Sequence, residues 1–232
     1  MTTPDRPGDR LRELVAVMSR LRAQCPWDAK QTHESLAPHL LEESYEALDA
    51  LESGDPDALR EELGDVLLQV MFHAQIASER SDGTGYTIDD VAGGIADKLT
   101  RRHPHVFGDV SVSGADEVKQ NWDAIKAAER AAKEGGPGSV LDGVPFGQPA
   151  LALAAQLQRR AERAGAPPDL AEVTSADTPG AELGAALFAL VARARAAGLD
   201  PELELRATAR AYRDRVLAWE KDRRPDESPR RA

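Results

Sequence analysis

Residues 41–67, with the sequence LEESYEALDALESGDPDALREELGDVL, decide the fold because they predict two helices joined by a tight turn. Ser53 and Gly54 end the first helix, and Asp55 is a typical N-cap with Pro56 at the first helical position of the second. Helices joined by so short a connection lie antiparallel. We therefore expect a helical hairpin whose arms run from about residue 36 to 52 and from 56 to 80.

Carboxylates occur at matching places on the two arms of this hairpin. Glu43 and Glu46 lie three residues apart and share a helix face, as do Glu62 and Asp65. An acidic face on the first arm alone is typical of a solvated surface. Counting outward from the turn brings the two pairs level, however, so four carboxylates are expected to converge. Two like charges about 4 Å apart repel by roughly 4 kcal/mol at an effective dielectric of about 20, so such a cluster requires protons or divalent cations.

The second arm is apolar in almost every direction, and we expect it to be buried. Its apolar residues are Leu63, Val66, Leu67, Leu68, Val70, Met71, Phe72 and Ile76. Glu62 and Asp65 then sit on a buried helix, where an ionised carboxylate needs a cationic partner. Arg60 is the cation closest in sequence, but it projects toward a different face.

The ligand set favours Mg²⁺, with Mn²⁺ as the alternative, because hard oxygen ligands without His or Cys select these ions over Zn²⁺ or Fe²⁺. A di-iron bundle would carry Glu-x-x-His pairs, and none of the five histidines has an acidic residue three positions before it. Carboxylate-bound Mg²⁺ suits phosphate chemistry because the ion offsets charge on phosphate oxygens. The residues thus indicate phosphoryl-group hydrolysis.

Helical periodicity continues on both sides of the hairpin. Further helices are predicted at about residues 9–24, 88–102, 115–133, 150–164, 181–197 and 201–221. Gly135 to Ser139 interrupt this pattern, so we expect a first domain at 1–134, a linker at 135–148, a second helical domain at 149–221 and a disordered tail at 222–232.

Composition agrees with a cytoplasmic all-α protein. Ala, Leu, Glu and Arg are abundant and aromatic residues make up only 4%, which favours helices. The net charge of −11 argues against nucleic-acid partners, which require a basic face. The single Cys25, the missing signal segment and the short apolar runs argue against secretion and against membrane insertion.

Several motifs in the same order resemble the MazG-type nucleoside triphosphate pyrophosphohydrolases. Glu42-Glu43-Ser44-Tyr45-Glu46 followed by Glu62-Leu63-Gly64-Asp65 looks like the EExxE…ExxD signature of that family. Cys25-Pro26-Trp27-Asp28 before the signature strengthens the likeness, as does Arg101-Arg102-His103-Pro104-His105-Val106-Phe107 after it. The resemblance covers about residues 11–133.

The resemblance implies a helical bundle of the all-α NTP pyrophosphatase type that works as a homodimer or higher oligomer. It implies Mg²⁺-dependent attack of water on the α-phosphate of nucleoside triphosphates, with release of pyrophosphate, as in house-cleaning of the nucleotide pool. The family's metal ligands fall on Glu43, Glu46, Glu62 and Asp65, and Glu42 with Glu43 would serve in water activation. The substrate-binding positions of the family correspond to Lys98, Arg101, Arg102, Trp122, Lys126, Trp27 and Gln31.

Structural roles compete with binding for some of these outer residues. Arg101 and Arg102 end a helix, where cations interact favourably with the macrodipole. Trp27 and Trp122 are candidates for core aromatics, and His103 and His105 for shaping the loop around Pro104.

A weak internal repeat distinguishes the second half of the chain. Residues 181–187, AELGAAL, resemble residues 61–67, EELGDVL, but Ala185 replaces the aspartate and no EExxE precedes Glu182. We therefore expect the second repeat to be degenerate and to serve packing or oligomerisation. Two alternatives to the pyrophosphohydrolase remain: a non-catalytic nucleotide-binding or regulatory module, and a hydrolase of the γ-phosphate.

Overall fold

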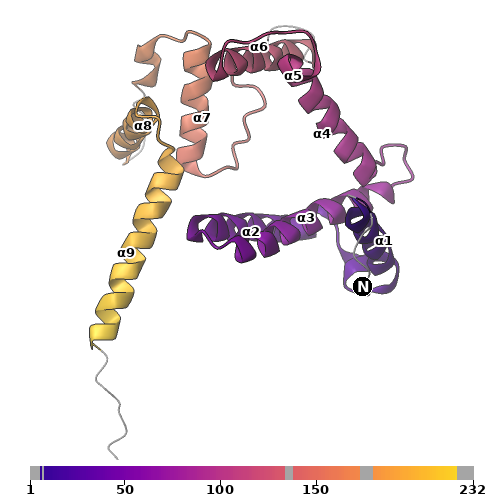
Figure 1. Ribbon diagram of the computed structural model, residues 1–232. Coiled ribbons are helices and arrows are strands. Elements are labelled where there is room, and N and C mark those ends of the chain that lie inside the picture. The colour runs from indigo at the N-terminus through magenta and orange to yellow at the C-terminus, as the bar shows by residue number, and fades with distance from the viewer. Residues whose placement is uncertain (1–5, 7, 134–137, 173–179, 224–232) are drawn as a thin grey trace, which may run out of the picture. The chain divides into compact units, whose positions relative to one another are not determined.

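The computed structural model describes residues 6, 8–133, 138–172 and 180–223, and all regular elements within these ranges are helices (Figure 1). In order they are α1 (Asp9–Gln24), η1 (Asp28–Lys30), α2 (His33–Ser53), α3 (Pro56–Ser78), α4 (Ile88–Arg102), α5 (Pro104–Phe107), α6 (Ala115–Lys133), α7 (Ala150–Arg163), η2 (Pro168–Ala171), α8 (Ala181–Ala196) and α9 (Pro201–Arg223). The expected all-α class is confirmed. Within the described residues, none of these helices is both long and apolar enough to cross a membrane.

The chain divides into two compact units, Met1–Lys126 and Ala127–Ala232. Their boundary falls within α6, so one continuous helix leads from the first unit into the second. The expected linker at 135–148 stays a prediction, and its first three residues lie outside the described ranges. The expected tail also lies outside them, except for Asp222 and Arg223, which are the last residues of α9.

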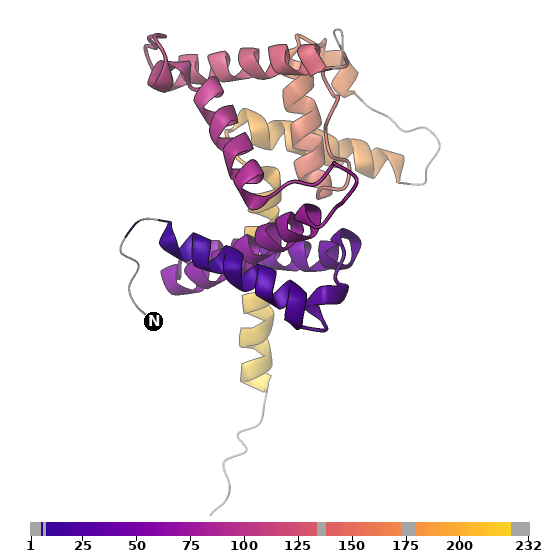
Figure 2. The same ribbon diagram turned by 90° about the vertical axis from the view of Figure 1, so that its right-hand side faces the viewer.

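The predicted hairpin is α2 and α3, which lie side by side in both views (Figures 1 and 2). Gly54 ends α2 in the left-handed conformation with φ of 73°, which a residue without Cβ adopts at little cost. The Asp55 side chain then accepts hydrogen bonds from the N–H groups of Asp57 and Ala58. Helix α2 begins earlier than expected because Thr32 and Ser35 cap each other's backbone N–H groups.

The core of the first unit forms where α1, α2 and α3 meet. Met18, Leu36 and Phe72 are buried there, one from each helix, with Leu68 and Ile76 packed against them. This core covers the second half of α3, whereas Leu63 in its first half is 54% exposed. The expectation that α3 is buried all round is therefore wrong for its first half, because α1 packs near Phe72 and leaves the turn around Leu63 uncovered.

Capping and ring contacts organise α4, α5 and α6. Thr87 and Asp90 form a reciprocal capping pair at the start of α4. His103 ends α4, where its Nδ1 lies 2.7 Å from the Leu99 carbonyl oxygen, and Pro104 begins the short helix α5. The Trp122 ring of α6 lies 4.7 Å from the His103 ring and beneath the Arg102 guanidinium at 5.4 Å. These contacts fix the loop around Pro104 against α6.

The second unit is built on α7, α8 and α9. Val191 of α8 is buried, and the buried Gln158 of α7 donates to the Phe188 carbonyl oxygen across the helix pair. Between α7, η2 and α8 lies a mainly apolar cavity of about 610 Å³. Leu157, Phe188, Ala192 and Ala196 are among the residues that line it.

Candidate metal centre

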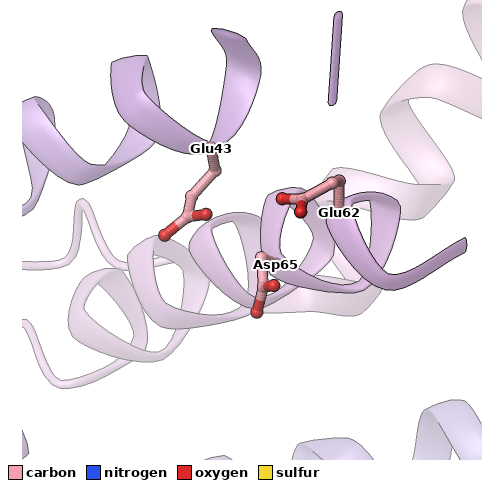
Figure 3. Close-up of side chains that lie close together, drawn as sticks. All are labelled: Glu43, Glu62 and Asp65. Atoms are coloured by element: carbon pink, nitrogen blue, oxygen red, sulfur yellow. The ribbon is translucent and has the colours of Figure 1, made fainter. Parts of the chain in front are cut away.

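Three of the four expected metal ligands converge at the middle of the hairpin. Glu43 extends from α2 toward Glu62 and Asp65 of α3 (Figure 3). One carboxylate oxygen from each residue lies within 4.8 Å of the others, and all three side chains are half-buried. Glu62 and Asp65 are three residues apart, so the helical repeat places both on the face that meets α2. This is the spacing at which oxygens from two helices can surround one cation.

The electrostatics of this cluster favour a bound cation. Burial, followed by repulsion from Asp65 and Glu46, raises the pKa of Glu43 above its ordinary value. Burial, followed by repulsion from Glu46 and Asp65, likewise raises the pKa of Glu62. Among the described residues, the structure records no ion pair for Glu43, Glu62 or Asp65. The repulsion is therefore uncompensated by protein side chains.

Glu46 and Glu42 lie outside the group of three. Glu46 is exposed and is not among the residues whose oxygens meet, although its charge raises the pKa of both Glu43 and Glu62. Glu42 points to a different side, where its carboxylate lies 3.6 Å from His39 Nδ1. Arg60 pairs with Asp57 at 2.8 Å, in agreement with the expectation that it projects away from the cluster.

A buried polar group lies one helical turn beyond the cluster on α3. Gln69 follows Asp65 by four residues and is 5% exposed. Its Oε1 is buried and accepts no hydrogen bond from any described residue. Buried acceptors are rarely left unpaired, so this oxygen is well suited to a donor on a bound molecule.

Trp27 and Gln31, two expected substrate-binding residues, lie in the loop between α1 and α2. The Trp27 ring is 54% exposed and meets Phe72 and His39 at ring distances of 6.3 Å each. This exposure argues against a core role for Trp27. The Gln31 amide braces the loop instead of projecting from it, since it donates to the Trp27 carbonyl oxygen and accepts from the Ser35 hydroxyl.

The other expected substrate-binding residues gather at the far end of α4 and on α6. Lys98 and Arg101 are exposed, and Arg102 is half-buried over the Trp122 ring. Lys126 lies one turn beyond Trp122 on α6. The structure brings Arg102 and Trp122 together, with the guanidinium 5.4 Å from the ring centre.

Two polar contacts around the site escaped the sequence reasoning. Arg22 of α1 and Glu79 after α3 form a two-pronged ion pair, with N–O distances of 2.9 and 2.6 Å. His33 of α2 and His73 of α3 stack with their Nδ1 atoms 2.8 Å apart. Both contacts join residues at least 40 positions apart, and neither pair carries a local spacing pattern that would have revealed it.

A family model matches the part of the chain that holds these features. Residues 31–107 match the MazG nucleotide pyrophosphohydrolase domain. The matched region contains α2, α3, α4 and α5, and so includes the carboxylate cluster.

Sequence relatives extend the likeness over most of the chain. A nucleoside triphosphate pyrophosphohydrolase/pyrophosphatase MazG of Thermotoga maritima is 40% identical over 92% of this chain and 86% of its own length. An uncharacterized 26.1 kDa protein of Streptomyces cacaoi is 48% identical over 93% of this chain and 85% of its own length. A nucleoside triphosphate pyrophosphohydrolase of Mycobacterium tuberculosis is 50% identical over 75% of this chain, which spans about half (53%) of that relative.

Proposed function

The chain belongs to the MazG family of nucleoside triphosphate pyrophosphohydrolases, and we propose that it hydrolyses these substrates to monophosphate and pyrophosphate at the cluster of Glu43, Glu62 and Asp65. The observation that carries the proposal is the meeting of three half-buried carboxylates from two helices, for which no ion pair is recorded with any residue that the structure describes. A non-catalytic binding module does not require such a costly arrangement. The enzymatic reading is therefore preferred over the regulatory one.

Mg²⁺ is the proposed cofactor, with Mn²⁺ as an alternative. Glu43, Glu62 and Asp65 supply only hard oxygen ligands, and their mutual repulsion is relieved by a divalent ion. The charge of Glu46 raises the pKa of both Glu43 and Glu62, and its carboxylate would complete the proposed ligand set. When bound, the ion neutralises phosphate charge and lowers the pKa of a coordinated water.

Other residues of the first unit are assigned to the substrate. Glu42 and Glu43 are the proposed residues for water activation, and Lys98, Arg101, Arg102 and Lys126 for the phosphates. Trp27 is the proposed base contact. Its ring lies 6.3 Å from the His39 ring, and His39 precedes Glu43 by four residues, or about 6 Å, along α2. Trp122 on α6 and Gln31 in the loop are also proposed to bind the substrate.

We propose that the enzyme is a homodimer or higher homo-oligomer. Leu41 and Leu51 of α2 and Leu63 of α3 are 54–61% exposed, and a second copy that covers them would bury this apolar surface. On α4, Val91, Ile95 and Leu99 form a second exposed stripe at four-residue spacing. A second copy that covers these faces could also bring the α4 cations to the carboxylates. A molar mass near 25.0 kDa in solution, that of one chain, would contradict this.

The reaction is tested by identifying the first product. Purified protein is incubated with a panel of ribo- and deoxyribonucleoside triphosphates, with pyrophosphate and orthophosphate detected separately. We expect pyrophosphate and monophosphate in the presence of Mg²⁺ and neither with a chelator. Orthophosphate as the first product would instead indicate attack at the γ-phosphate, and nucleotide binding without turnover would indicate the regulatory module. We also propose that the enzyme is cytoplasmic, and that its substrates are free nucleotides and not nucleic acids.

A further inference from the structure

Arg22 joins three separate parts of the first unit. Its Nε and Nη2 donate to the two carboxylate oxygens of Glu79 at 2.9 and 2.6 Å. Its Nη1 donates to the backbone carbonyl oxygens of Asp28 and Gln31, the latter at 3.2 Å. The guanidinium group therefore ties helix α1 to the end of α3 and to the part of the loop that follows Trp27.

The surroundings make this arrangement rigid. The Arg22 side chain is only 10% exposed, and its guanidinium lies 6.0 Å from the centre of the Phe72 ring, which also meets Trp27. Pairing with Glu79 raises the pKa of Arg22, and the same pair lowers the pKa of Glu79, so both groups stay ionised. Bidentate pairs of this kind combine a strong interaction with a fixed geometry.

The loop has few other long-range supports. Gln31 and Ser35 brace it through hydrogen bonds within residues 27–35, and the Lys30 and Gln31 amides donate to the carbonyl oxygens of Trp27 and Asp28. These bonds give the loop its shape but do not attach it to α3. Arg22 supplies the polar attachment beside the contact of the Trp27 and Phe72 rings, because it reaches the loop carbonyls and Glu79 at the same time.

We propose that Arg22 is a positioning residue that holds Trp27 where its indole can stack on the base of the substrate. The inference rests on the proposed function, since Trp27 meets a base only if nucleotides bind at the hairpin. Stacking on an aromatic ring tolerates any base, so Arg22 would set affinity for nucleotides in general and not choose among them. Phosphate chemistry at the carboxylates would proceed unchanged once a substrate is bound.

The test is Arg22→Lys, because lysine keeps the charge beside Glu79 but cannot reproduce the planar fork. We expect KM to rise about tenfold with kcat within about twofold, the pattern of lost uniform binding. Arg80→Lys is the matched control, since Arg80 pairs with Asp82 at 2.5 Å on the surface and we expect no change in KM. Hydrogen exchange at the Lys30 and Gln31 amides should accelerate only in Arg22→Lys.

A double variant separates positioning from general stability. If Arg22 acts through Trp27, Trp27→Ala combined with Arg22→Lys should raise KM no further than Trp27→Ala alone. Additive effects, an unchanged KM, or an equal loss of kcat in Arg22→Lys would overturn the inference. Failure of the proposed function is distinct, because then the unaltered protein itself would release no pyrophosphate.

Discussion

Helices α3 and α8 contain similar sequences, but different parts of the protein pack against them. On α3, Leu68, Phe72 and Ile76 pack against Leu36 of α2 and Met18 of α1. Aligning residues 61–67 with 181–187 places Phe188, Ala192 and Ala196 at the same positions of α8, where they line an open cavity. The first unit thus has a helix on this face, and among the described residues of the second unit no counterpart of α2 occurs.

This difference shows that the acidic centre is a property of a helix pair. The second repeat retains Glu182 at the position of Glu62, but Ala185 stands at the position of Asp65, and among the described residues no second group of three possible metal ligands is found. A helix of similar sequence therefore does not assemble a comparable cluster by itself. Three predictions test the comparison.

The largest effect is expected from removing a carboxylate of the first unit. Glu62→Ala should lower kcat/KM for pyrophosphate release at least about 10³-fold, because the remaining oxygens would hold Mg²⁺ poorly. Glu182→Ala is the matched control in the second unit and should leave activity within about twofold. Comparable losses in both variants would show that the second repeat takes part in the chemistry.

The next effect concerns packing and not catalysis. Phe72→Ala removes a buried ring from the core and should lower the free energy of unfolding by at least about 3 kcal/mol in urea titrations. The reverse change at the matching position, Ala192→Phe, places a ring in the open cavity and should raise it by about 0.5–1 kcal/mol. A destabilised Ala192→Phe protein would mean that the cavity has no room for this side chain.

The smallest effect concerns stability without metal. The pKa of Glu62 is raised above its ordinary 4.5 in the folded protein, so the folded state binds more protons than the unfolded state over the interval above that value. Stability of the metal-free protein is therefore lost as the pH rises through this interval. Glu62→Gln should raise the metal-free Tm near pH 7.5, and the difference from the unaltered protein should vanish toward pH 4.

A second measurement completes this prediction. Mg²⁺ should raise the Tm of the unaltered protein because a ligand that binds only the folded state stabilises it. The same concentration should raise the Tm of Glu62→Gln much less. An equal rise in both proteins would place the ion elsewhere.

The helices could be predicted from sequence because their ends carry local signals. Asp55 with Pro56 and Thr87 with Asp90 define the beginnings of α3 and α4, and Gly54 ends α2. The Thr32–Ser35 capping box is a local signal of the same kind, and it begins α2 earlier than the predicted start at about residue 36. The helix α5 was not expected, because Pro104 both ends one helix and starts another.

The candidate site could be predicted only as far as spacing along helices reaches. The spacing brought Glu43, Glu62 and Asp65 together correctly, but the direction of individual side chains decided that Glu46 lies outside the group. The burial of side chains along α3 could not be predicted from spacing either. It depends on where α1 crosses α3, and this covers only one half of the helix. The pair of Arg22 and Glu79 joins residues 57 positions apart, which no local pattern can reveal.

The stacked imidazole rings of His33 and His73 make the contact between α2 and α3 sensitive to acid. With their Nδ1 atoms 2.8 Å apart, the two rings can share one proton but not carry one each without repulsion. Burial, followed by the neighbouring ring, lowers the pKa of His73, so this contact loses stability as the pH falls below about 6.5. The carboxylates farther along the same seam respond in the opposite sense, because their raised pKa values make the metal-free hairpin lose stability as the pH rises above about 4.5.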